Sequence, residues 1–153
     1  AYAPDVVARV RVNPFALDLP PAQMPDAEEP DTLLFAGHFL HAPNVEAACW
    51  LAEDILPRVQ RRRPGAWLLL VGPDPHARVR SLGLRPGVTV TGAVPDVVPL
   101  LRAATVVAAP VRAGGGQRMK VLYGMAATRR GRVCGGGAMS ARALVRTTEG
   151  GVA

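Results

Sequence analysis

Three consecutive glycines stand directly before two basic side chains, Arg118 and Lys120, in the stretch "VRAGGGQRMKVLYGMA". Glycine lets backbone N–H groups approach a ligand closely, and a helix N-terminus carries unpaired N–H donors with a partial positive charge. A helix that begins near Gln117 would add both side chains to these donors, so Gly114, Gly115, Gly116, Arg118 and Lys120 predict a phosphate site. The alternative interpretation is a flexible loop before a solvated helix face.

The elements that must position this site follow from an alternation of apolar runs and helical segments. Strands are predicted at residues 33–36, 67–71, 88–91 and 106–109, and helices within residues 43–63, 74–83, 96–104 and 116–127. Near-continuous apolar strands separated by helices are typical of parallel strands buried on both faces. The sequence therefore predicts an α/β fold, a Rossmann-like, doubly wound parallel sheet with helices on both faces, with ligands at the carboxyl ends of the strands.

Several residues at the predicted carboxyl ends are further candidates for the site. Gly37 and Gly72 close the first two strands, and His38 follows in the first loop, where a ligand could reach it. An ordinary loop histidine is the alternative. Asn44 is expected to cap or start the first helix, and the Pro-Asn pair also offers a way to shape the site.

Composition restricts the class of partner only weakly. The formal net charge is +6, yet Lys120 is the only lysine and arginine is abundant, a bias that a GC-rich coding sequence produces whatever the protein does. We therefore expect a solvated or anion-facing surface and no nucleic acid partner. Cys49 and Cys134 have no metal-binding spacing, so no metal site is expected. No apolar run reaches the ~20 residues of a membrane span, and no signal pattern opens the chain, which predicts a cytoplasmic protein.

The segments "LLFAGHFLHAPNVEAACWLAEDILPRVQRRRPGAWLLLVG" and "VTVTGAVPDVVPLLRAATVVAAPVRAGGGQRMKVL" together resemble the donor-binding half of family-4 glycosyltransferases of the GT-B fold. The resemblance extends from about residue 31 to residue 126. It implies a nucleotide-diphospho-sugar donor, a reaction that retains the anomeric configuration, and no cofactor or obligatory metal. It also implies that the chain is one half of a GT-B enzyme, incomplete at its C-terminus. The acceptor, a sugar or a lipid, would bind a preceding domain, so the chain alone should be inactive.

The resemblance also assigns roles to individual residues. In the family the diphosphate meets the glycine turn and the basic residues matched by Arg118 and Lys120. The base and ribose lie against the loop matched by Val94, Pro95 and Asp96, although Asp96 is also a good helix N-cap. The family's "KVLE" helix carries a glutamate that binds ribose, and this chain has Tyr123 there. A tyrosine hydroxyl cannot accept two hydrogen bonds in the bidentate manner of a carboxylate.

The predicted domain organisation has two parts. Residues 1–30 are rich in proline and acid and are expected to be an interdomain linker or the end of a preceding domain. Residues 31–153 are expected to form the nucleotide-sugar-binding domain. Residues 127–140 depart from the family pattern and are interpreted as an insertion or an aberrant segment. Within them, residues 129–140 are expected to form no regular element and to be mobile, because they offer little apolar surface.

Two other functions stay open at this point. Tyr123 is compatible with a non-catalytic nucleotide-binding or regulatory module that transfers no sugar. The arginine-rich composition is compatible with a basic adaptor for an anionic membrane or nucleic acid. Peripheral membrane association also remains open for the glycosyltransferase, whose expected partners are the donor and an acceptor sugar or lipid.

Overall fold

The sheet is the central layer of the molecule. The computed structural model describes residues 29–110, 124 and 133–135. Within this part of the chain five strands form one sheet with the order β3-β2-β1-β4-β5, and every neighbouring pair is parallel. The strands are β1 (Glu29–Ala36), β2 (Trp67–Val71), β3 (Val88–Gly92), β4 (Ala104–Ala109) and β5 (Val133–Gly135). The four strands predicted from apolar runs are therefore confirmed.

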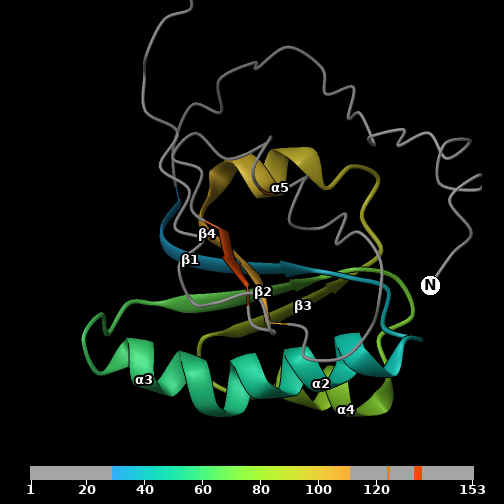
Figure 1. Cartoon of the computed structure of the whole chain (residues 1–153), viewed down its shortest axis with the longest axis horizontal. Coiled ribbons are helices and arrows are strands. Elements are labelled where there is room, and N and C mark those ends of the chain that lie inside the picture. Colours follow the sequence, from blue (N-terminus) through green and yellow to red (C-terminus); the bar gives the residue numbers. More distant parts are fainter. Residues whose placement is uncertain (1–28, 111–123, 125–132, 136–153) are drawn as a thin grey trace, which may run out of the picture.

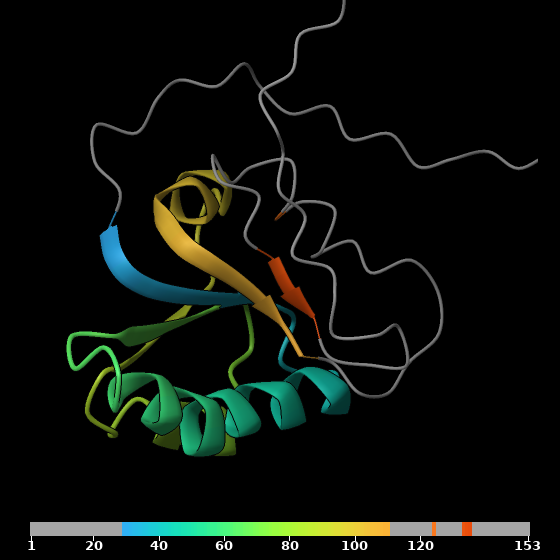
Figure 2. The same ribbon diagram turned by 60° about the vertical axis from the view of Figure 1, so that its left-hand side comes forward.

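Helices cover both faces of this sheet (Figure 1). On one face α2 (Ala42–Trp50), η1 (Leu51–Ile55) and α3 (Leu56–Gln60) follow one another without a break, and α4 (Ala77–Leu82) lies beside them. On the other face lies α5 (Val98–Ala103), which the turned view also separates from the remaining helices (Figure 2). The predicted Rossmann-like, doubly wound arrangement is confirmed.

The two faces of β1 supply two separate hydrophobic clusters. Leu33 and Phe35 point to the side of α2 and α4, while Leu34, between them in sequence, packs with Leu101 of α5. Phe35 and Leu34 have no exposed surface. This alternation follows from the two-residue period of a strand, and burial on both faces explains why Leu33, Leu34 and Phe35 are consecutive apolar residues.

The long helix on the first face contains a π-helical turn. The backbone N–H of Leu56 donates to the carbonyl of Leu51, five residues earlier, instead of four. Pro57 follows immediately, and a proline inside a helix lacks an N–H and clashes with the carbonyl four residues before it. The wider turn therefore lies where the proline interrupts the regular ladder, and the helix continues to Gln60.

Strand β5 corrects one expectation. Residues 129–140 were expected to form no regular element, and this is wrong for Val133–Gly135, which pair with β4 through Val107↔Val133, Ala108↔Cys134 and Ala109↔Gly135. The physical reason is that β4 would otherwise present unpaired N–H and C=O groups at the sheet edge. The rest of that segment, and its expected mobility, lie outside the described residues.

The ends of the predicted domain are only partly described. Strand β1 begins at Glu29, so the sheet starts slightly before the expected boundary at residue 31. The helix predicted at residues 116–127 is described only at Gly124, which is helical and buried. None of the helices in the described ranges is long and apolar enough to cross a membrane.

Candidate functional site at the carboxyl edge of the sheet

The strand order creates a switch point beside β1. The chain passes from β1 outward to β2 and β3, and then returns to place β4 on the opposite side of β1. Loops after β1 and β4 therefore diverge, and ligands of open α/β sheets bind in the crevice at such a point. The chain that leaves β4 runs directly into the predicted phosphate segment. Its candidates, Gly114, Gly115, Gly116, Arg118, Lys120 and Tyr123, all lie outside the described residues.

The backbones after β1 and β2 are packed against each other. The N–H of Gly37 donates to the carbonyl of Val71 at 2.9 Å, and the N–H of Gly72 donates to the carbonyl of Gly92 at 3.0 Å. Gly72 has a φ of 151°, and a Cβ added to it would lie 1.9 Å from the carbonyl oxygen of Gly37. No side chain fits between these loops, so Gly72 has a structural reason to be glycine. The structure brings together two predicted site residues here, Gly37 and Gly72.

His38 lies at the same edge with an ordered set of contacts. Its Nδ1 accepts from the N–H of Leu40 at 3.4 Å, and its carbonyl accepts from Nδ2 of Asn44 at 2.8 Å. Its Nε2 lies 3.5 Å from Oδ2 of Asp74, in the loop after β2. The side chains of His38 and Asp74 are 43% and 58% exposed, so both are accessible to a ligand.

Asn44 corrects a second expectation. It was expected to cap or start the first helix, but α2 begins at Ala42 with His41 as its N-cap residue. Pro43 already occupies the first turn, where the fixed φ of proline favours a helix start, and this places Asn44 inside the helix. Its side chain instead joins the helix to the loop through the carbonyl of His38.

The loop after β3 contains the three residues assigned to base and ribose. The expectation that Asp96 is the helix N-cap is wrong by one residue, because Val97 is the N-cap of α5; Asp96 nevertheless accepts from the N–H of Val98 at 2.9 Å through Oδ1. Val94 is half-buried and packs against the cluster under α5, while Pro95 and Asp96 are exposed. Their predicted contacts with a nucleotide remain predictions.

Sequence reasoning missed Asp74. Its φ is 49°, a left-handed conformation that is uncommon outside glycine, and Pro75 would ordinarily restrict it to extended conformations. The available signal was an acidic residue soon after the strand-closing Gly72, in "VGPDP". The importance of its position appears only from its approach to His38, because the two residues lie on loops of different strands.

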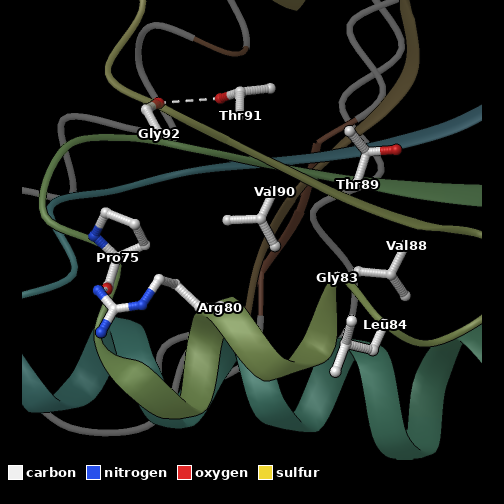
Figure 3. A pocket seen from close by; sticks show the side chains of 9 residues that line it. All are labelled: Pro75, Arg80, Gly83, Leu84, Val88, Thr89, Val90, Thr91 and Gly92. Carbon is white, nitrogen blue, oxygen red and sulfur yellow. Dashed lines mark hydrogen bonds between the residues drawn. The ribbon is translucent and has the colours of Figure 1, made fainter.

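A shallow hollow of about 540 Å³ lies between α4 and the edge strand β3 (Figure 3). Its one charged lining residue, Arg80, donates from Nη1 to the carbonyl of Pro75 at 2.5 Å. The other lining residues are Pro75, Gly83, Leu84, Val88, Thr89, Val90, Thr91 and Gly92. This hollow lies on the far side of β2 from the switch point, and its guanidinium is already engaged, so it does not contribute to the candidate site.

The described ranges were searched for metal-binding groups and for reactive thiols. They contain no group of three or more His, Cys, Asp or Glu side chains that could hold a metal ion. Cys49 is buried under the sheet, and burial raises the pKa of its thiol above the ordinary value of 9.0, with Arg78 opposing the shift. A buried, protonated thiol is a poor nucleophile.

Comparison with known proteins assigns the chain to a family. The family model described as Glycosyl transferases group 1 matches residues 30–130, which include all of β1 except its first residue, all of β2 to β4, and the predicted phosphate segment. No curated protein matches the chain.

Proposed function

The chain belongs to the glycosyl transferases of group 1, and on this premise we propose that it binds the nucleotide-diphospho-sugar donor at the carboxyl edge of its sheet. The observation that carries the proposal is the switch point between β1 and β4, from which the chain continues into Gly114 to Lys120. The close packing of the loops that begin at Gly37 and Gly72 supports it, because it fixes the backbone at the same carboxyl edge of the sheet, where ligands of open α/β sheets bind.

In this proposal the diphosphate is held by backbone N–H groups of Gly114 to Gly116 and by the side chains of Arg118 and Lys120. When the bond between the anomeric carbon and the phosphate oxygen breaks, negative charge develops on the departing nucleoside diphosphate. Positive groups fixed around that charge stabilise the transition state more than the bound donor. The transfer retains the anomeric configuration and requires no metal, as the resemblance to family-4 enzymes implies.

Recognition of the nucleoside is assigned to the loop after β3. The exposed Pro95 and the half-buried Val94 offer an apolar surface for a base, and backbone groups of this loop offer polar contacts. Oδ1 of Asp96 already accepts from the N–H of Val98 at the start of α5, so we assign its carboxylate primarily to holding the loop. The acceptor, a sugar or a lipid, is bound by a preceding domain, and the chain alone binds donor without transferring sugar.

A non-catalytic nucleotide-binding module is the second candidate, and Tyr123 is the observation that favours it. The residue stands where related enzymes carry a ribose-binding glutamate. The two candidates differ in one respect that can be measured. A transferase joined to its acceptor domain releases sugar from a radiolabelled donor, whereas a regulatory module binds the donor and leaves it intact.

Thermal unfolding of the full chain with added nucleotides tests the proposal. A ligand that binds only the folded state raises the unfolding temperature, so uridine, guanosine or adenosine diphosphate should raise it, and the matching monophosphate should raise it less. Inorganic pyrophosphate at the same salt concentration is the control for charge alone. An equal rise with pyrophosphate would indicate a general anion surface, and no rise with any diphosphate would contradict the proposal.

A further inference from the structure

We propose that Asp74, positioned by His38, accepts hydrogen bonds from hydroxyl groups of the bound nucleotide sugar. The inference rests on the proposed function, because it concerns the same bound donor. In the sheet β2 lies between β3 and β1, and β1 adjoins β4. The loop that carries Asp74 therefore lies between the loop assigned to the base, residues 94–96, and the crevice assigned to the diphosphate. Parallel strands are spaced about 4.8 Å apart, so a nucleotide that spans this edge passes the loop after β2.

The backbone at Asp74 is held in a conformation that costs free energy. A non-glycine residue at a φ of 49°, directly before Pro75, has two separate steric penalties. Conformations of this kind persist where the surrounding structure fixes them, and they concentrate at sites that bind ligands. Here the fixing contacts are those of the preceding loop, since the N–H of Phe39 donates to the carbonyl of Pro73 at 3.3 Å.

His38 orients the carboxylate. Its Nδ1 accepts from the N–H of Leu40, so in the neutral ring the proton is on Nε2, the atom that lies 3.5 Å from Oδ2 of Asp74. Asn44 fixes the same loop through the carbonyl of His38. Within residues 29–110 no donor contacts Oδ1 of Asp74, and the side chain is 58% exposed. That oxygen is therefore available to a ligand.

The chemistry of a carboxylate selects the part of the ligand. It repels phosphate and accepts from hydroxyl groups, of which a nucleotide sugar carries two sets, on the ribose and on the transferred sugar. The chain has Tyr123 where the family carries a ribose-binding glutamate, so Asp74 supplies a carboxylate in place of that glutamate. Hydroxyl groups of either set can donate to the carboxylate, so titration with 2′-deoxy nucleotides and with nucleotide sugars is needed to distinguish them.

The test is calorimetric titration of the full chain and its Asp74→Asn variant. Uridine, guanosine and adenosine diphosphates are compared with their 2′-deoxy counterparts and with UDP-glucose, GDP-mannose and ADP-glucose. Asparagine tolerates the left-handed conformation, so the variant is expected to fold. We expect its affinity to fall about tenfold, the size of a hydrogen bond to a charged group. If Asp74 contacts the ribose, the variant should bind the nucleoside diphosphates more weakly and should no longer distinguish them from their 2′-deoxy counterparts. If Asp74 contacts the transferred sugar, only the affinity for the nucleotide sugars should fall.

Two further variants separate ligand binding from a merely structural role. Asp74→Gly removes the carboxylate and the backbone strain together, so it should lower affinity without lowering the unfolding temperature. His38→Ala should lower affinity in the wild type and have little further effect when Asp74 is already asparagine, because it acts through that carboxylate. Asp31→Asn is the matched control, since Asp31 is also left-handed, with a φ of 59°, and lies 3.6 Å from Arg63 at the opposite end of β1.

Each result decides between the two proposals. If the wild type binds a diphosphate and Asp74→Asn binds every ligand equally well, the inference about Asp74 is wrong while the proposed function stands. Equal losses in Asp74→Asn and Asp31→Asn would also overturn it, because they would indicate a general charge effect. If the wild type binds none of the nucleotides, the proposed function fails and the inference fails with it.

Discussion

The carbonyl oxygen of Gly37 occupies the space that a side chain at Gly72 would need, with 1.9 Å between that oxygen and an added Cβ. Because the obstacle is backbone held by the hydrogen bond from Gly37 to Val71, it cannot move aside cheaply. We predict that Gly72→Ala lowers the free energy of unfolding by about 3 kcal/mol, measured by urea denaturation.

The control is Gly65→Ala, in the exposed loop before β2. An added Cβ meets nothing within 4 Å there, so this variant should be neutral or slightly stabilising. If both variants denature at the same urea concentration, the close approach of the two loops is not a feature of the folded protein.

A second prediction concerns the hydrogen bond between Trp67 and Thr32. The indole Nε1 donates to Oγ1 of Thr32 at 2.5 Å, and Thr32 is 1% exposed. Thr32→Val keeps the shape of the side chain and removes the acceptor, which leaves a donor without a partner. We expect a loss of about 1–2 kcal/mol in the free energy of unfolding.

The matched control repeats that substitution in a Trp67→Phe background, where no indole donor is present. The cost of Thr32→Val should then be clearly smaller, and the difference measures the interaction between the pair. An equal cost in both backgrounds would show that the loss comes from the hydroxyl alone.

A third prediction follows from the burial of Cys49. Burial raises the pKa of the thiol and limits access, so at pH 8 the native protein should react with N-ethylmaleimide at least about tenfold more slowly than the urea-unfolded protein. A Cys134→Ser background restricts the measurement to one thiol. Because the pKa is raised, the native rate should increase only at pH values above the ordinary thiol range. Equal rates in native and unfolded protein would contradict the buried position.

Four strands of the sheet were predictable because each contains a short apolar run, whereas β5 lies in a segment that was expected to form no regular element. Strand β2 ends just before Gly72, and β3 ends at Gly92. The observed bounds of both strands agree within one residue with those predicted from the sequence. The π-helical turn was not predictable in the same way. The helical spacing of apolar residues at 45–59 is compatible with α-helical or π-helical hydrogen bonds. Only the position of Pro57 within the folded helix determines where the π-helical turn occurs.

The candidate site could be proposed from sequence only where one short segment contains the chemistry. Gly114 to Lys120 form such a stretch, and because they lie outside the described residues their role stays a prediction. Asp74 and His38 are distant in sequence and meet because β1 and β2 are neighbours in the sheet. Asn44 was misassigned because asparagine is a common N-cap residue, whereas Pro43 already lies in the first helical turn and the Asn44 side chain donates to the carbonyl of His38.

A fourth prediction addresses Tyr123 directly. Tyr123→Glu should strengthen the binding of a nucleoside diphosphate by about 1.5 kcal/mol if a carboxylate at this position recovers a hydrogen bond to ribose. Tyr123→Gln is the control, because it has a similar length without the charge. Calorimetric titration measures both. A weaker affinity in Tyr123→Glu than in Tyr123→Gln would indicate that the position faces the diphosphate rather than the ribose.

The most direct test of the central claim is the calorimetric affinity of Arg118→Ala and Lys120→Ala for uridine, guanosine and adenosine diphosphates. Arg61→Ala is the matched control, since it removes the same charge from an exposed position after α3, at the opposite edge of the sheet. A phosphate site predicts that each of the first two variants loses about 1.5–3 kcal/mol of binding free energy and that the control loses almost none. Wild-type affinity in both site variants, or an equal loss in the control, would contradict the claim that the chain holds its donor through Arg118 and Lys120.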